Sequence, residues 1–268
     1  MIQPASPKPG NHPTGKPPLS AYHGVALLPV APALIIPGLL WIQWRFTTLH
    51  PEATARWHPT LSGALNDQTV SDPFEILLFA TTPFLIFAVW LVIRYYWIMA
   101  DRLLSGGSPW RRYFWRGYVL LAGLLQLMAA IGMLMVVHYP SHTSSGPHVL
   151  GSYMLFAGHA ISIMLSGYLS RQLAHAPGAE RQGMPWQKRQ ARRWPISLLI
   201  AALAISYALL FYAPRHVEFL NNHSHSVFVA MLELLMLSMF LTYLLSFVRD
   251  LSQLVAEDYT SQKPQEAT

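Results

Sequence analysis

Cysteine is absent from this sequence and charged side chains are scarce, because Asp, Glu, Lys and Arg make up only 11% of the 268 residues. The lack of cysteine excludes disulfide bonds, thiolate metal sites and cysteine nucleophiles. An average soluble domain carries roughly 25% charged residues, so this chain has too few to cover the surface of a soluble globule. With 53% hydrophobic residues, the composition argues against a soluble enzyme and for a protein that lies mostly in lipid.

Long apolar segments account for most of the remaining chain. A helix needs about 20 apolar residues to cross the hydrocarbon core of a bilayer. Six segments are long enough, at about 24–42, 76–99, 117–137, 149–170, 195–213 and 226–248. We therefore predict an all-α fold, a polytopic membrane bundle of six transmembrane helices. Prolines 29, 32 and 37 are expected to bend the first of them.

The basic residues predict the orientation of the bundle. Of the 18 Lys and Arg residues, 15 fall in the two tails, at the end of the second segment or in the connections 100–116 and 171–194. Basic residues collect on the cytoplasmic side of membrane proteins. We therefore expect both termini to be cytoplasmic, and the connections 43–74, 138–148 and 214–225 to face outward.

This predicted topology divides the chain into two tails and a transmembrane domain. Residues 1–22 are rich in proline and predict a disordered cytoplasmic tail. Residues 23–252 form the transmembrane domain, and residues 253–268 are a polar cytoplasmic tail. The outer loop 43–74 is too short to form a core of its own, so we expect it to pack on the helix ends.

Few ionisable or strongly polar groups fall within the apolar segments. Glu233, His159 and Gln126 lie at comparable depth in segments six, four and three. A carboxylate inside a membrane is unfavourable unless it is paired or protonated. The three side chains are therefore candidates for a buried network that handles a proton or binds a ligand. The alternative is a set of hydrogen bonds that only fixes helix packing.

Histidine is abundant near the predicted outer ends of the helices. Neutral imidazoles from separate loops can converge on a metal ion, with Asp67 or Asp72 as a further ligand. The candidates for such a divalent metal site are His138, His142, His148, His223 and His225. No defined spacing such as HExxH is present, so scattered interfacial histidines are the alternative. No Walker loop, dinucleotide fingerprint or serine-hydrolase elbow occurs, and nothing indicates nucleic-acid binding.

Several short motifs, in their order and spacing, resemble the FRAG/DRAM/Sfk family of six-span membrane proteins, which is related to Cwh-type and PGAP-type proteins of GPI-anchor maturation. The motifs are HPTLSGALND at 58–67, VIRYYW at 92–97, HVLGSYMLF at 148–156, and FLTYLLSFVRDL at the end of the sixth segment. The resemblance implies a role in lipid remodelling, lipid organisation or autophagy, without an agreed catalytic mechanism. It makes His148, Glu233, Arg94 and Asp250 positions to test. Arg94 and Asp250 both lie at the cytoplasmic boundary, where we expect them to form a structural ion pair.

Three hypotheses for the function remain open. The first is a lipid-interacting or lipid-organising protein with an outward-facing cavity between spans three, four and six, lined by Glu233, His159, Gln126 and His148. The second is a metal-assisted hydrolase or acyltransferase that acts on a lipid at the outer face. The third is an accessory subunit that binds other membrane-protein subunits. In each case membrane lipid is the expected partner, no cofactor other than a metal is expected, and short loops favour a bacterial plasma (inner) membrane.

Overall fold

The computed structural model describes residues 22–212 and 222–262, with side chains described up to 211 and from 222 to 258. Apart from short turns these residues are helical, and no strand occurs among them. The helices are α1 (His23–Ala26), α2 (Val30–Leu49), α3 (Pro51–Arg56), α4 (Leu61–Ala64), α5 (Gln68–Leu103), α6 (Pro109–His138), α7 (Ser145–Ala174), η2 (Ala179–Gln182), α8 (Met184–Tyr212), α9 (His223–Leu245) and α10 (Val248–Gln262).

The prediction of six membrane-spanning helices is confirmed. Within the described residues, six helical stretches are long and apolar enough to cross a membrane. Most extend well beyond the apolar segments, and α5 begins at Gln68, where the side chain of Asp67 accepts a hydrogen bond from the Thr69 amide. Much of the basic connection predicted at 171–194 is also helical, because α8 begins at Met184. A backbone near a membrane satisfies its hydrogen bonds most readily in a helix, and this favours helix beyond the apolar core.

The segment 253–268, predicted as a polar cytoplasmic tail, is helical as far as Gln262, because α10 continues beyond residue 252. Leu251 and Leu254 are buried, whereas polar residues alternate with them along the helix. This amphipathic pattern keeps the chain helical beyond its apolar part. The predicted tail 1–22 lies almost entirely outside the described residues. In the first span, the helix is broken at 27–29 and resumes after Pro29, and Pro37 lies within α2.

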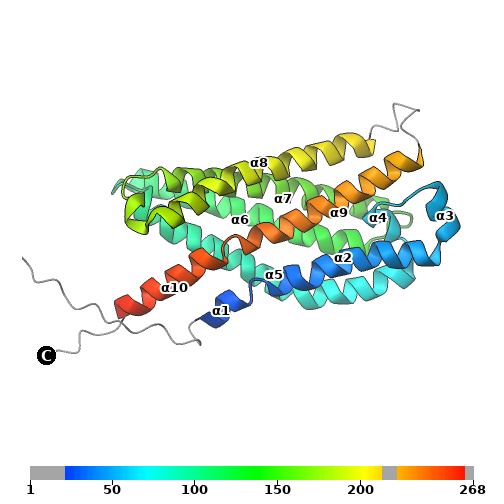
Figure 1. Ribbon diagram of the computed structural model, residues 1–268, viewed down its shortest axis with the longest axis horizontal. Coiled ribbons are helices and arrows are strands. Elements are labelled where there is room, and N and C mark those ends of the chain that lie inside the picture. Colours follow the sequence, from blue (N-terminus) through cyan, green and yellow to red (C-terminus); the bar gives the residue numbers. More distant parts are fainter. Residues whose placement is uncertain (1–21, 213–221, 263–268) are drawn as a thin grey trace, which may run out of the picture.

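Both ends of the described chain lie at one end of the bundle, with α1 and α10 side by side (Figure 1). We call this the terminal end. The short helices α3 and α4 lie at the opposite end. The outer loop packs on the helix ends as expected, because Leu61 and Ala64 of α4 are buried and α4 contacts α2 and α9.

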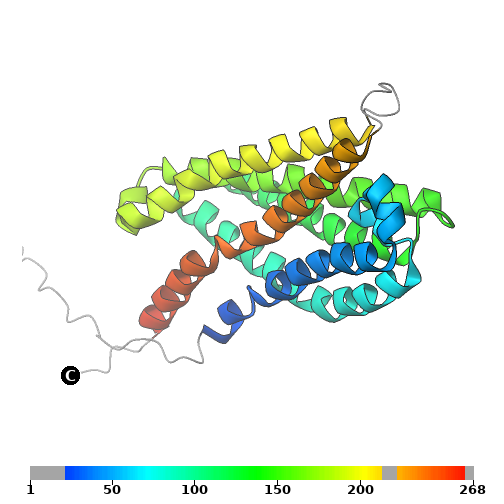
Figure 2. The same cartoon turned by 45° about the vertical axis from the view of Figure 1, so that its right-hand side comes forward.

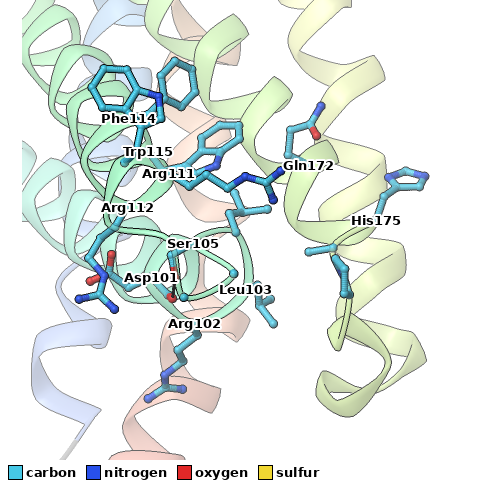
Figure 3. Close-up of a pocket in the computed structure, with 16 residues that line it drawn as sticks. Asp101, Arg102, Leu103, Ser105, Arg111, Arg112, Phe114, Trp115, Gln172 and His175 are labelled. Carbon is cyan, nitrogen blue, oxygen red and sulfur yellow. Dashed lines mark hydrogen bonds between the residues drawn. The ribbon is translucent and has the colours of Figure 1, made fainter.

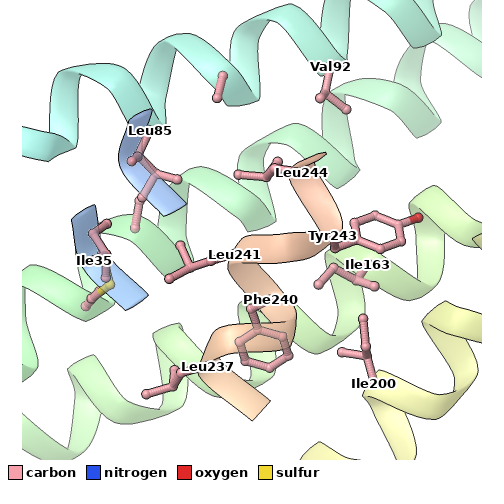
Figure 4. Close-up of a cluster of buried hydrophobic side chains, with 14 of the residues drawn as sticks. Ile35, Leu85, Val92, Ile163, Ile200, Leu237, Phe240, Leu241, Tyr243 and Leu244 are labelled. Carbon is pink, nitrogen blue, oxygen red and sulfur yellow. The ribbon is translucent and has the colours of Figure 1, made fainter. Parts of the chain in front are cut away.

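Helix α9 occupies the middle of the bundle. It contacts α2 and α5 on one side and α7 and α8 on the other, and it crosses between these groups in Figure 2. Leu237, Phe240, Leu241 and Leu244 of α9 meet apolar side chains of the surrounding helices (Figure 4). Any polar side chain on the buried faces of α9 therefore lies inside the protein rather than in lipid.

Helices α6 and α7 approach each other through glycines. A Cβ atom on Gly132 of α6 would lie 2.5 Å from the carbonyl oxygen of Gly151 on α7. Small residues at such positions let transmembrane helices pack backbone to backbone, which compensates for the absence of a hydrophobic driving force within lipid. The close α6–α7 contact fixes the position of α7, and with it the side chain of His159, which packs against Phe240 of α9.

Candidate functional site

At the opposite end of the bundle, the carboxylate of Glu233 lies beneath α4. Glu233 is 1% exposed. The backbone amide of Leu61 donates a hydrogen bond to Oε2 at 2.5 Å, and the hydroxyl of Tyr207 donates to Oε1 at 3.1 Å. Helix α4 is positioned for this contact by Thr60, whose hydroxyl accepts a hydrogen bond from the Gly63 amide. The buried carboxylate thus holds an end segment of the protein against α9.

A cavity of about 30 Å³ adjoins Glu233 and is lined by residues of α6, α7 and α9, together with α2, α4 and α5. His159 also lines it and is 2% exposed, with its ring edge-on to Phe240 at a centroid distance of 4.7 Å. Pockets for small organic ligands usually measure about 300–1,000 Å³. The predicted space between spans three, four and six therefore exists and is lined by Glu233 and His159, but residues of α4 also line it and its volume is far below that of a lipid.

Of the three residues predicted to form a buried network, Glu233 and His159 line the same cavity and Gln126 does not. Gln126 is buried but lines a different cavity of about 30 Å³, with Ser162 and Tyr243. No direct hydrogen bond joins Gln126, His159 and Glu233 to one another in the part of the chain that the structure describes. The depth of Gln126 was predicted from the sequence, but the face of α6 on which it lies was not.

The candidate metal-binding histidines have separate partners. The Nδ1 atom of His138 lies 2.7 Å from Glu75, that of His142 lies 3.3 Å from Asn66, and that of His148 donates to the Tyr139 carbonyl at 2.8 Å. His225 donates to the Leu210 carbonyl at 3.0 Å, and His223 is exposed at the start of α9. Among residues 22–211 and 222–258, no three His, Asp or Glu side chains are arranged to hold a metal ion. His148 does not line the cavity beside Glu233.

Asp67, the acid considered for the metal site, has a structural role at the start of α5. Its carboxylate lies 2.6 Å from Nε2 of His50 and accepts two further hydrogen bonds from Thr69. The hydrogen bond from His50, followed by that from Thr69, holds the pKa of Asp67 below its ordinary value of 3.8. This carboxylate is therefore ionised at neutral pH and joins the end of α2, at His50, to the start of α5.

A second buried polar cluster lies near the terminal end, around Asp250 of α10. Asp250 contacts Arg193 at 2.6 Å, Arg189 at 2.7 Å and the amide of Gln190 at 2.8 Å. The Gln190 amide also donates to the hydroxyl of Tyr95 at 2.7 Å. Arg193 is only 2% exposed, so its charge depends on these partners. The cluster joins α5, α8 and α10.

The predicted ion pair between Arg94 and Asp250 is wrong. Arg94 is exposed on α5 and lies over the ring of Trp90, 5.7 Å from its centroid. Asp250 takes its arginine partners from α8 instead. The sequence placed both residues at the same boundary of the membrane, but their side chains leave α5 and α10 on different sides. The charge of Arg189 and Arg193 indicates only a basic connection, whereas the spacing of 189, 190 and 193 places these residues on adjoining turns of one helix face.

A large pocket opens at the terminal end, between the α5–α6 turn and the end of α7 (Figure 3). Its volume is about 800 Å³. The turn that forms its floor contains Gly106 and Gly107, whose φ angles of 53° and 77° are strained for any residue with a side chain. Polar and aromatic residues of the lining include Asp101, Arg102, Trp110, Arg111, Arg112, Trp115, Gln172 and His175.

The arginines of this pocket differ in their partners. Arg102 is paired with Glu257 at 3.0 Å. Arg111 and Arg112 are exposed, and no carboxylate pairs with either of them within the described residues. In Figure 3 the Arg111 side chain extends from α6 towards Gln172 on α7. Asp101, the acid of the lining, is paired with Arg116 at 2.6 Å. The pocket therefore presents uncompensated positive charge.

Comparison with known families gives one match, which covers most of the chain. The sequence model described as the Frag1/DRAM/Sfk1/Cwh43P N-terminal domain matches residues 25–254. The chain belongs to this family. It is an integral multi-pass membrane protein, as the family and its six apolar helices both show. Searches of curated proteins and of solved structures found no match.

The segments that resemble the Frag1/DRAM/Sfk1 family come together in two places. The segment 58–67 contains Leu61, which donates to Glu233 in the sixth span. The segment 92–97 contains Tyr95, which is joined through Gln190 to Asp250 in the last family-like segment. Residues of the family-like segments thus take part in both buried polar clusters. The 800 Å³ pocket, in contrast, is lined by residues outside these segments.

Proposed function

We propose that this member of the Frag1/DRAM/Sfk1 family is a lipid-interacting protein that binds the headgroup of an anionic lipid in the pocket between the α5–α6 turn and α7. The observation that carries the proposal is a pocket of about 800 Å³ with unpaired arginines at the edge of the membrane-spanning region. This volume lies within the usual range for small-ligand sites. The closed cavity at Glu233 does not provide comparable space.

The charge of the pocket favours a phosphate-bearing headgroup. Arg111 and Arg112 each present a guanidinium group, which matches the geometry of a phosphate with two parallel hydrogen bonds. His175 and Gln172 supply further hydrogen-bonding groups on the α7 side. A zwitterionic headgroup would place its own positive group near these arginines. An anionic lipid is therefore the favoured ligand class.

The aromatic residues at the start of α6 support a position at the level of lipid headgroups. Trp110 is 78% exposed and Tyr113 is 68% exposed. Exposed tryptophan and tyrosine are typical of the membrane–water interface, where their rings lie among headgroups. A lipid at this level could place its headgroup in the pocket and keep its acyl chains beside the apolar surface of α6.

The distribution of basic residues supports the cytoplasmic leaflet as the source of this lipid. We propose that the terminal end is cytoplasmic, because the basic connections and both ends of the described chain lie there. Anionic lipids are concentrated in that leaflet, and each Lys or Arg near its surface contributes about 1 kcal/mol of attraction. A direct ion pair of an exposed arginine contributes up to about 1 kcal/mol, so two such pairs with the headgroup phosphate account for about 2 kcal/mol, or roughly a 30-fold change in affinity.

Native mass spectrometry of the purified protein with defined lipids tests the proposal. Binding of dioleoylphosphatidylglycerol should exceed binding of dioleoylphosphatidylcholine. The double variant Arg111→Gln with Arg112→Gln should lose roughly 30-fold in affinity for the anionic lipid and little for the zwitterionic one.

The matched control removes two positive charges from the same end of the bundle but outside the pocket. Lys188 and Arg192 are exposed on α8 and do not line it. The double variant Lys188→Gln with Arg192→Gln should retain most of the binding. Equal losses in the two double variants would show general surface attraction and would contradict a defined headgroup site.

A further inference from the structure

The cavity beneath α4 has a polar lining that the lipid pocket does not explain. It brings together Glu233 of α9 and His159 of α7, which are 1% and 2% exposed. Most of the other residues that line it are apolar, including Leu155, Met133 and Leu237. Apart from Ser62, Glu233 and His159 are the hydrogen-bonding side chains of this lining, and their presence in a largely apolar cavity favours a small polar ligand between them.

His159 supplies an unpartnered atom. Its Nδ1 is fully buried and makes no hydrogen bond within the described part of the chain. A buried ring nitrogen without a partner is unfavourable, because it has lost its hydrogen bonds to water and gained none in return. Polar groups buried inside proteins are satisfied by protein atoms or by ordered water in the great majority of cases. The imidazole of His159 therefore requires a partner in the space that it lines.

Glu233 has acceptor capacity left for the same ligand. Each carboxylate oxygen offers two lone-pair directions. The carboxylate accepts protein hydrogen bonds from the Leu61 amide at Oε2, from the Tyr207 hydroxyl at Oε1 and from the Ser62 amide. Three of the four directions are thus used, and the fourth is left to accept from a donor in the cavity.

The volume limits the ligand to the size of water. A cavity needs about 10–15 Å³ to hold one water molecule, and the molecule needs two or more polar partners. The cavity measures about 30 Å³. An amine-bearing or phosphate-bearing headgroup is too large for this space while α4 covers it.

We propose that this cavity is a hydration site, in which one or two water molecules bridge Nδ1 of His159 and the carboxylate of Glu233. The water donates a hydrogen bond to Glu233 and satisfies the ring nitrogen of His159. Helices α7 and α9 and the short helix α4 are then joined through a single polar cluster. The proposal is independent of the lipid pocket, which lies at the terminal end.

X-ray radiolysis of the full-length protein in H₂¹⁸O tests the hydration site. Hydroxyl radicals formed from internal water oxidise neighbouring side chains and transfer ¹⁸O to them, and methionine is easily oxidised to its sulfoxide. Met133 lines the cavity, whereas Met236 is fully buried on α9 and lines neither this cavity nor that of Gln126. Met128 is 43% exposed on α6 and reports bulk water that reaches the lipid-facing surface.

The expected result is ¹⁸O incorporation at Met133 several-fold above both Met236 and Met128. The variant His159→Phe removes the ring nitrogens and should reduce labelling at Met133 to the level of Met236. Labelling of Met133 in the unaltered protein no greater than at either control methionine would overturn the proposal, and this comparison does not depend on the folding of any variant.

Discussion

Replacement of Asp250 by asparagine removes a buried negative charge while preserving the shape of the side chain. Arg189, Gln190 and Arg193 all contact this carboxylate within 2.8 Å, and the Asp250 side chain is 0% exposed. Loss of one partner from a buried ion pair generally costs about 3–5 kcal/mol, because the other charge remains buried without compensation. Arg193 keeps its hydrogen bond to the Ser246 carbonyl, so we expect the lower part of this range, about 3 kcal/mol.

Equilibrium unfolding in mixed micelles by titration with SDS, followed by tryptophan fluorescence, measures this change. Asp101→Asn is the matched control, because the Asp101–Arg116 pair is partly exposed, with side-chain exposures of 24% and 32%. Such pairs contribute about 0–1 kcal/mol. Equal losses of less than about 1 kcal/mol in both variants would refute the account of Asp250 as the centre of a buried ionic cluster.

The double replacement Asp250→Leu with Arg193→Met provides a further check on the same reasoning. Exchange of a buried ion pair for apolar residues of similar volume is often neutral in stability, and Arg189, which also loses its carboxylate partner, has a side chain that is 26% exposed and within reach of water. The double variant should therefore be more stable than Asp250→Asn. A double variant that is less stable than the single one would show that the cluster contributes through hydrogen bonds rather than through charge compensation.

Three other variants test separate parts of the structure. Glu233→Gln replaces one of two acceptor oxygens by an amide donor, which should cost about 1–3 kcal/mol and accelerate hydrogen exchange of the α4 amides; unchanged exchange would contradict the contact between Glu233 and α4. The pKa of Asp67 is lowered on folding, so its contribution to stability is present above the unfolded pKa of 3.8 and is lost as pH falls through the folded pKa. The difference in melting temperature between Asp67→Asn and the unaltered protein should therefore shrink below pH 3.8. A difference that grows there would contradict a lowered pKa of Asp67 in the folded protein. Gly132→Ala forces a Cβ into the α7 backbone and should cost about 1–3 kcal/mol, whereas Gly117→Ala, which meets nothing within 4 Å, should be neutral or stabilising by about 0.5–1 kcal/mol.

The number and location of the spans could be predicted from the sequence because burial in lipid imposes a simple requirement. Each crossing needs a long apolar run, and six such runs are visible in the residues. The ends of the helices could not be predicted in this way. The first turns of α8 and the later turns of α10 contain many polar residues, such as Lys188 and Gln253. The polarity of these residues alone does not distinguish a helix from a connection.

The buried polar residues could be predicted from their depth, but their partners could not. Residue counting gives the position of a side chain along the membrane normal, whereas contact also depends on the rotation of each helix about its axis. Glu233 and His159 do share a cavity, while Gln126 at similar depth faces another one. Asp250 was matched to Arg94 for the same reason, although Arg193 lies on the helix that faces it.

The contact between Leu61 and Glu233 lay beyond prediction for another reason. The two residues are 172 positions apart, and the donor is a backbone amide that any residue type could supply. The arginines around the α5–α6 turn indicate a basic connection in the sequence, but a basic connection gives no sign of a pocket. Only the positions of α6 and α7 show that Arg111 faces a space of about 800 Å³.

The proposed function depends on the binding of an anionic headgroup at Arg111, between the α5–α6 turn and α7. The most direct measurement is a cryo-electron microscopy map of the protein in nanodiscs that contain phosphatidylglycerol and phosphatidylcholine. We predict headgroup density within hydrogen-bonding distance of the Arg111 guanidinium in the unaltered protein, and its loss in the Arg111→Gln variant. Ordered lipid elsewhere on the bundle with an empty pocket at Arg111, or the same density in both proteins, would contradict the account.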